Sequence, residues 1–199
     1  NEIAQLFRGH SAAVTSVAVS PVADWFATGS LDGSFRIWDP RVSSNAIAAG
    51  KPGTVPLVAI DPSGQVLLVA GRRVGCTLFD TSHEGGGGAE MYDMRKLSAG
   101  PFQSSPPTFD PWKDTKLDDM SVYWSHGSFS ADGSLIALSA TNVGTCLLDA
   151  FSLQQLHVFP TPKSSSSSSS TTPSTSTRAA HCFSADGALL FLAGADGTV

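Results

Sequence analysis

One short pattern recurs along the chain and constrains its fold more than any other feature. It consists of a β-rich run, a turn of the Ser/Asp-Pro or Ala-Asp-Gly type, and a second β-rich run that ends in small residues. Four copies are present, at 14–30, 56–71, 123–140 and 180–194. Subtraction of residue numbers gives intervals of 41, 69 and 54 residues between the turn residues Pro21, Pro62, Ala131 and Ala185. The chain is therefore predicted to consist of repeats of one supersecondary unit.

The length and composition of a copy indicate the kind of unit. The first interval matches the roughly 40–45 residues of a four-stranded propeller blade. The strands in a copy are short, rich in β-branched or aromatic residues and bounded by turns, as at 35–38 after Asp32-Gly33. No segment sustains an apolar period of 3.6 residues over ten residues, so almost no helix is expected. The predicted class is all-β, a partial β-propeller with four-stranded antiparallel blades.

Insertions between strands explain the two longer intervals. A run of serines at 164–170, four glycines at 85–88 and two prolines at 106–107 cannot form a buried strand ladder. Surface insertions are tolerated because loop-closure entropy grows slowly with length. We expect a single domain over 1–199 with repeats at about 6–44, 45–110, 120–160 and, truncated, 178–199. Disordered insertions are expected at about 81–90, 103–119 and 161–177.

Composition excludes several classes of function. The 12 Lys and Arg residues against 17 Asp and Glu residues give a formal charge of −5, the wrong sign for neutralising nucleic-acid phosphates. The sequence has neither an apolar run of about 18 residues nor a basic secretory leader, so we expect an intracellular, soluble protein without a membrane partner. Cys76, Cys146 and Cys182 are far apart and form no C-x-x-C pair, which indicates small buried side chains with reduced thiols.

The first copy carries the most specific signal. It runs from Gly9-His10 to Trp38-Asp39, with Thr28 and Asp32 between these dipeptides. The dipeptides and their spacing resemble the signature of the WD-repeat family of β-propellers. The resemblance implies a hydrogen-bonded chain from Asp32 to His10, from His10 to Thr28, and from Thr28 to the indole N–H of Trp38. Buried polar groups that pair with one another fix strand register, so we interpret this set as structural.

Catalytic and metal sites were weighed against this interpretation. A histidine near an aspartate and a hydroxyl suggests a hydrolase, but Thr28 falls inside a predicted strand and its other partner is an indole, which cannot act as a base. The glycines at 85–88 lack the Lys-Ser/Thr of a phosphate loop. Zinc spacing is absent among the histidines and cysteines, and His181-Cys182 falls in a predicted core strand. We predict no catalytic residue, cofactor, metal ion or small-molecule substrate.

Smaller motifs indicate a more specific resemblance within the WD-repeat proteins. None of three motifs is a general WD feature: Tyr92-Asp93-x-Arg95, Gly100-Pro101-Phe102 and Asp149-Ala150-Phe151. Their order, after Phe7-Arg8-Gly9-His10 and Gly50-Lys51-Pro52, is similar to that in the WD-repeat subunit of COMPASS-type histone H3 lysine-4 methyltransferase complexes. That family is shared with the machinery of RNA 3′-end cleavage and polyadenylation. The match extends almost from end to end, and the Gly-rich and Ser-rich insertions depart from it.

This resemblance implies both an architecture and a role. The whole protein would be a seven-bladed propeller, of which this chain holds about four repeats and is open at both ends. The role would be that of a nuclear, non-catalytic scaffold whose partners are a SET-domain methyltransferase subunit and the tail of RNA polymerase II. The alternative is a scaffold of an mRNA 3′-end processing or protein phosphatase complex. Either assignment depends on the resemblance, because fold alone does not fix function.

Two details stay open in the sequence. Both 76–80 and 90–93 have the composition of the third strand of the second blade. Spacing from Gly71 favours the first segment, whereas motif order favours the second. Exposed aromatic and Arg side chains often anchor interfaces, but they also pack. On that basis, four residues at predicted loop tips are candidate partner contacts: Trp25, Arg72, Arg73 and Trp112.

Overall fold

The computed structural model describes residues 5–42, 45–52, 55–72, 88–106, 109, 124–140, 143–160 and 180–193. Within these residues the chain forms fourteen β-strands and one short 3-10 turn, η1 (Leu97–Ala99). The predicted all-β class is therefore confirmed. A search of the same residues finds no helix long and apolar enough to cross a membrane.

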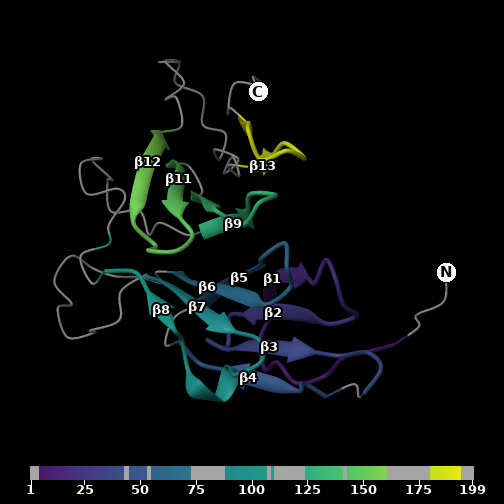
Figure 1. Ribbon diagram of the computed structural model, residues 1–199. Helices are drawn as coiled ribbons and strands as arrows, with labels where there is room; N and C mark the ends of the chain where they lie inside the picture. Colours follow the sequence, from purple (N-terminus) through teal and green to yellow (C-terminus); the bar gives the residue numbers. More distant parts are fainter. Residues whose placement is uncertain are drawn as a thin grey trace, which may run out of the picture.

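The strands form three four-stranded antiparallel sheets and one two-stranded piece (Figure 1). The first sheet contains β1 (Val14–Val19), β2 (Phe26–Ser30), β3 (Phe35–Trp38) and β4 (Ala48–Gly50). The second contains β5 (Val55–Ile60), β6 (Val66–Arg72), β7 (Ala89–Asp93) and β8 (Gln103–Ser104). The third contains β9 (Trp124–Phe129), β10 (Leu135–Ala140), β11 (Gly144–Asp149) and β12 (Gln155–Pro160). The short piece pairs β13 (His181–Phe183) with β14 (Leu190–Leu192). Successive antiparallel sheets in chain order are propeller blades, here named blades 1 to 4.

The recurring sequence pattern forms the turn between the first two strands of a blade. In blade 2 the Asp61 carboxylate accepts the backbone N–H groups of Gln65 and Val66 at 2.8 and 2.7 Å. In blade 3 the Ser130 hydroxyl accepts the N–H of Leu135 at 2.9 Å. In blades 2, 3 and 4 a glycine with positive φ completes the turn, a conformation that glycine adopts without steric cost. The φ values in blades 2, 3 and 4 are 67°, 73° and 72°, at Gly64, Gly133 and Gly187.

The blades pack against one another through apolar side chains. Strand β5 contacts β1 and β2 of blade 1 on one side and β9 of blade 3 on the other. One buried cluster joins blades 2 and 3 and includes Met91 and Leu148. A second cluster joins blades 1 and 2 and includes Phe35 and Tyr92. Burial of these side chains is the main contribution that holds neighbouring blades together.

Strand β7 is the third strand of blade 2. Its residues pair with β6, with Met91 opposite Leu68 and Tyr92 opposite Leu67. Met91 and Tyr92 are both buried and belong to the two different clusters, so each face of the strand packs against a neighbouring blade. The segment at 90–93, which motif order favoured, therefore belongs to the third strand of blade 2. The competing segment at 76–80 lies outside the described residues.

Three expected boundaries need correction. Blade 1 extends past residue 44, because Ala48–Gly50 pairs with β3. Ala89 and Glu90 belong to β7, and Gln103 and Ser104 form β8, so these residues use their backbone groups in the sheet rather than in insertions. The described residues include little else of the expected insertions at 81–90 and 103–119. They include none of the Ser-rich segment at 161–177.

Candidate functional site

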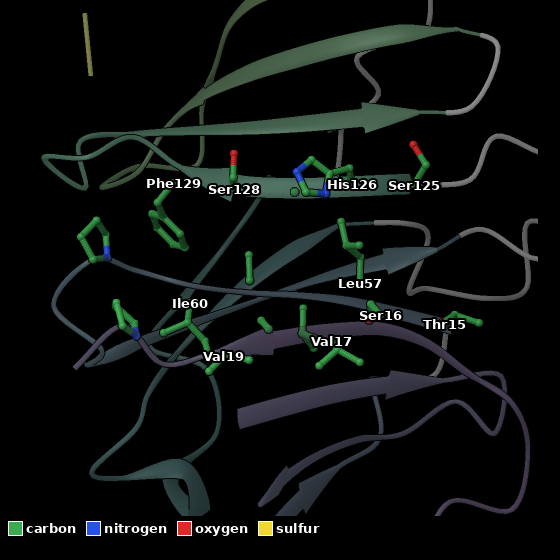
Figure 2. A pocket seen from close by; sticks show the side chains of 16 residues that line it. Thr15, Ser16, Val17, Val19, Leu57, Ile60, Ser125, His126, Ser128 and Phe129 are labelled. Carbon is green, nitrogen blue, oxygen red and sulfur yellow. The ribbon is translucent and has the colours of Figure 1, made fainter. Parts of the chain in front are cut away.

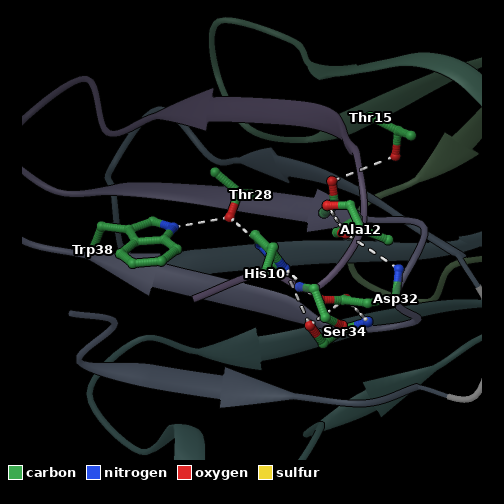
Figure 3. A network of polar contacts seen from close by, with 10 residues as sticks. His10, Ala12, Thr15, Thr28, Asp32, Ser34 and Trp38 are labelled. Carbon is green, nitrogen blue, oxygen red and sulfur yellow. Dashed lines mark hydrogen bonds and ion pairs between the residues drawn. The ribbon is translucent and has the colours of Figure 1, made fainter. Parts of the chain in front are cut away.

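Four buried polar side chains form a continuous chain of contacts in blade 1 (Figure 3). His10 Nδ1 lies 3.0 Å from Asp32 Oδ2, and His10 Nε2 lies 2.7 Å from Thr28 Oγ1. The indole N–H of Trp38 donates to the same Thr28 oxygen at 2.8 Å. Thr28 lies in β2, Asp32 in the β2–β3 turn and Trp38 at the end of β3. These are the four residues, in the same order, for which the WD-repeat resemblance implied a chain, and we name them the tetrad.

The direction of each hydrogen bond in the tetrad follows from its chemistry. An indole nitrogen only donates, so Thr28 accepts from Trp38 and donates its own proton to His10 Nε2. His10 then carries its proton on Nδ1 and donates it to Asp32. Thr28 is 6% exposed, and both ring nitrogens of His10 are occupied by other members. The tetrad therefore offers neither a free base nor an accessible nucleophile to a substrate.

Asp32 is the charged end of the tetrad. Burial alone would raise the pKa of this carboxyl. Hydrogen bonds from the Ser34 hydroxyl at 2.6 Å, the Ser11 backbone N–H at 3.0 Å and His10 outweigh that effect, and the pKa lies well below its ordinary value. The carboxylate is consequently ionised at neutral pH although its side chain is only 9% exposed.

A second buried polar network joins blade 3 to blade 4. His181 Nδ1 lies 2.5 Å from the Ser139 hydroxyl, and His181 Nε2 lies 2.9 Å from the Ser128 hydroxyl. Ser139 also contacts the Thr145 hydroxyl at 2.7 Å. Burial, together with the nearby His126, lowers the pKa of His181 to about 3, so the ring is neutral at physiological pH. Neutral hydrogen bonds thus hold β13 against β9 and β10.

This network was not predicted from the sequence. His181 was expected only to lie in a core strand, because its partners are 53 and 42 residues away along the chain. The partners are serines, which are too common to give a spacing signal. The only available signal was that a histidine in a buried strand must find hydrogen-bond partners.

The first strands of blades 1, 2 and 3 line an open cavity of about 600 Å³ (Figure 2). One end is apolar, with Val19, Ile60 and Phe129, and the other is polar, with Ser16 and Ser125. The innermost strands of propeller blades face the central channel, so the cavity corresponds to part of that channel. Its described lining carries no carboxylate and no Lys or Arg.

The four candidate partner contacts differ in what the structure shows of them. Trp25 is half-buried in the β1–β2 turn and packs against the cluster that joins blades 1 and 2. Arg72 ends β6, and its side chain lies outside the described part of the chain, as do Arg73 and Trp112. Trp25 thus packs within the chain, and whether it or any of the other three contacts a partner stays a prediction.

The cysteines occupy different surroundings. Cys146 is fully buried in β11, and burial raises the pKa of its thiol to about 12. Cys182 is exposed beside the buried His181, so the expectation of a buried side chain is wrong: adjacent strand residues point to opposite faces. Both thiols are free, and Cys76 lies outside the described residues. Among the residues with defined positions, no three His, Cys, Asp or Glu side chains gather as a metal site.

Known proteins similar to this chain share its repeat. The sequence profile of the family described as "WD domain, G-beta repeat" matches residues 1–39, the segment that contains the tetrad. Protein ANTHESIS POMOTING FACTOR 1 of Arabidopsis thaliana is 31% identical over 200 residues, which cover 100% of this chain and 50% of the relative. WD repeat-containing protein 82 of Drosophila melanogaster is 31% identical over 159 residues, 80% of this chain and 43% of the relative.

A third relative carries a more specific name. Set1 complex component swd2 of Schizosaccharomyces pombe is 28% identical over 191 residues, 96% of this chain and 47% of the relative. The chain spans about half the length of the curated relatives it matches. The family profile, the relatives and the four-stranded blades agree with one another. The chain contains a WD40 repeat domain.

Proposed function

We propose that this chain is part of a non-catalytic scaffold subunit of a Set1-type histone H3 lysine-4 methyltransferase complex. The observation that carries the proposal is the similarity to Set1 complex component swd2 over 96% of the chain. The motifs that resemble the COMPASS-type subunit, from Tyr92 to Phe102 and from Asp149 to Phe151, are part of the same sequence similarity. Under this proposal the protein works in the nucleus and assembles other proteins without an enzymatic step of its own.

The position of these motifs supports a binding role. Asp93 accepts the backbone N–H of Arg95 at 2.9 Å and its guanidinium at 3.1 Å, which closes the turn after β7. Asp149 accepts the N–H of Phe151 at 3.1 Å in the corresponding turn after β11. Both turns connect the third and fourth strands of a blade. Within these motifs Tyr92 and Ala150 are buried, whereas Phe102 and Phe151 are exposed in the connections between strands, where a partner protein can contact them.

The hydrogen bonds of the tetrad within blade 1 also support a binding role without catalysis. His10 and Thr28 hydrogen-bond within blade 1, so their chemistry serves the fold. In the proposed role, the rim turns and blade surfaces hold a SET-domain methyltransferase subunit. The same surfaces contact the phosphorylated tail of RNA polymerase II and so couple methylation to transcription.

Affinity purification of the tagged full-length protein, followed by mass spectrometry, tests the proposal. We expect a SET-domain protein to be recovered in amounts close to those of the tagged subunit. A tagged, unrelated propeller expressed at the same level is the control. Recovery of RNA cleavage factors or a protein phosphatase without any SET-domain protein would assign the chain to the alternative complex. Recovery of none of these proteins would contradict both assignments.

A further inference from the structure

The contact between blades 3 and 4 is polar where the contact between blades 2 and 3 is apolar. Blades 2 and 3 share one strand register, so the residues on their faces correspond one to one. Towards blade 3, blade 2 presents the buried apolar side chains of Leu57, Ala59, Ala70 and Ala89. The residues of blade 3 at the same positions are His126, Ser128, Ser139 and Thr145. An imidazole and three hydroxyls therefore replace four apolar side chains.

His181 of blade 4 lies against this polar face. Its side chain is buried, and its two ring nitrogens contact the hydroxyls of Ser139 at 2.5 Å and Ser128 at 2.9 Å. Its ring centroid is 4.6 Å from that of His126, which is exposed in the cavity beside Ser128 on β9 (Figure 2). We name the set the histidine seam, which consists of His126, Ser128, Ser139, Thr145 and His181.

A protonated His181 would find no carboxylate in the histidine seam. The other titratable side chains in the described strands and turns of blades 3 and 4 around the seam are those of Cys146, Cys182, Asp132, Asp149 and Asp186. Each of the three carboxylates accepts a hydrogen bond from a serine hydroxyl of its own turn. Cys146 lies in the apolar cluster between blades 2 and 3, and Cys182 is exposed. Among the described residues, only His126 can add charge to the seam, and that charge has the same sign.

The closed seam therefore accommodates only a neutral His181. A neutral imidazole donates from one nitrogen and accepts at the other, and a hydroxyl can fill either role. A buried imidazolium without a counter-charge is unfavourable, because burial disfavours the charged form. Water can solvate the charged ring only when β13 separates from β9 and β10. Proton uptake by His181 and opening of the seam are consequently coupled.

We propose that the histidine seam is a pH-sensitive switch that releases β13 and β14 from blade 3 when His181 takes up a proton. Blades 1 to 3 stay folded in the open state, because the two apolar clusters that join them contain no residue of blade 4. The proposal goes beyond the scaffold function and does not depend on it.

The direction of the switch follows from proton linkage. In the closed seam, burial and the nearby His126 lower the pKa of His181 to about 3. In the open state the ring is in water, where a histidine has a pKa of about 6.5. The open state thus binds the proton more tightly, so opening becomes more favourable as the pH falls below about 6.5.

Hydrogen exchange with mass spectrometry on the full-length protein tests the switch. Protection factors, which correct for the pH dependence of intrinsic exchange, are measured at pH 7 and pH 5 for β13–β14 and for the reference strand β6. We expect protection in β13–β14 to fall about 25-fold between these pH values, as linkage of one proton with the two pKa values requires. Protection in β6 should stay the same.

Variants identify the titrating group. His181→Gln should have equal protection in β13–β14 at both pH values, because glutamine forms hydrogen bonds but takes up no proton. The matched control is His157→Gln, which changes an exposed histidine of β12 outside the seam and should keep the wild-type fall. The triple variant His181→Val, Ser128→Ala, Ser139→Ala gives the seam the residues that blade 2 has at these positions. It should also be independent of pH, and it decides the question if His181→Gln does not fold.

Four results would overturn the switch. The first is wild-type protection in β13–β14 that does not change between pH 7 and pH 5. The second is a fall of wild-type size in His181→Gln. The third is an equal fall in β13–β14 and β6, which would show that acid unfolds the blades together. The fourth is the absence of protection in β13–β14 at pH 7, which would show that the seam is open when His181 is neutral.

Discussion

Blade 1 and blade 3 have the same strand order but fill equivalent interior positions with opposite chemistry. Strand register places Thr28 and Trp38 of blade 1 at the positions of Leu138 and Leu148 in blade 3. Thr28 and Trp38 are hydrogen-bonded within the tetrad, whereas both leucines are fully buried in an apolar cluster. A blade of this fold therefore does not require the tetrad, because an apolar set of side chains fills the same positions in blade 3.

The two interiors should respond differently to substitution. An apolar interior loses buried area and gains a cavity when a side chain is shortened. When a side chain is removed from a polar interior, its hydrogen-bond partners also remain buried and unpaired. Only the polar interior contains an ionised group, Asp32, whose hydrogen bonds depend on pH. Measurements of stability and of its pH dependence can therefore distinguish the two interiors.

Trp38→Ala is expected to have the largest effect. The indole is 2% exposed, and its ring contacts those of Phe7 and Phe26 at centroid distances of 5.7 and 6.2 Å. Loss of this packing should lower the free energy of unfolding by about 3–5 kcal/mol. Urea unfolding of the full-length protein measures the change. A loss below about 1 kcal/mol would show that blade 1 does not depend on this side chain.

Leu148→Ala tests the apolar counterpart in blade 3. The side chain is fully buried in the cluster that joins blades 2 and 3. We expect a loss of about 2–4 kcal/mol from the removed methyl groups and the cavity. The loss should be the same at pH 7 and pH 4, because no titratable group is removed. A loss that changes strongly between these two pH values would contradict the contrast between the blades.

Asp32→Ala removes the charged end of the tetrad. Its loss leaves His10 Nδ1 and the Ser34 hydroxyl without their carboxylate partner. The expected cost is about 1–3 kcal/mol in the free energy of unfolding, again from urea titration. Asp24→Ala, which changes a carboxylate whose side chain is 72% exposed, is the matched control and should cost less than about 0.5 kcal/mol. Equal effects of the two substitutions would indicate that the tetrad does not stabilise the blade.

Acid titration of Asp32 should give the smallest change in stability, and this change is specific to the Asp32 carboxyl. The pKa of Asp32 is lowered in the folded protein, so its ionised form contributes stability above the unfolded-state value of about 3.9. That contribution is lost as the pH falls from this value toward the folded pKa. The stability difference between wild type and Asp32→Asn should therefore shrink below about pH 4 and stay constant between pH 6 and 7. A difference that grows on acidification would reverse the assigned direction of the shift.

Much of the fold was predictable because each repeat carries its own local signals. The Gly residues of the Asp-Gly turns must adopt a positive φ, and Gly133 does so at 73°. Strand 35–38 was predicted from its aromatic and β-branched residues and is β3. The order of the tetrad also followed from motif resemblance, because Gly9-His10 and Trp38-Asp39 are specific dipeptides.

Long-range features were not predictable from these local signals. Both 76–80 and 90–93 had strand composition, and pairing with β6 identifies the second segment as the strand. The burial of His181 and the exposure of Cys182 depend on how β13 packs against blade 3, which alternation alone leaves undecided. The hydrogen bond from the Gln103 side-chain amide to the Ser152 carbonyl likewise depends on contact between blades 2 and 3.

Whether the tetrad serves only the fold can be tested by the recovery of a SET-domain protein with full-length Thr28→Val, at a temperature where circular dichroism shows the variant folded. Valine is a matched replacement because Val69 occupies the equivalent position in blade 2. If the tetrad serves only the fold and the protein works by binding, recovery should equal that of wild type although the melting temperature falls. A folded Thr28→Val variant that recovers no SET-domain protein, when wild type does, would contradict that account.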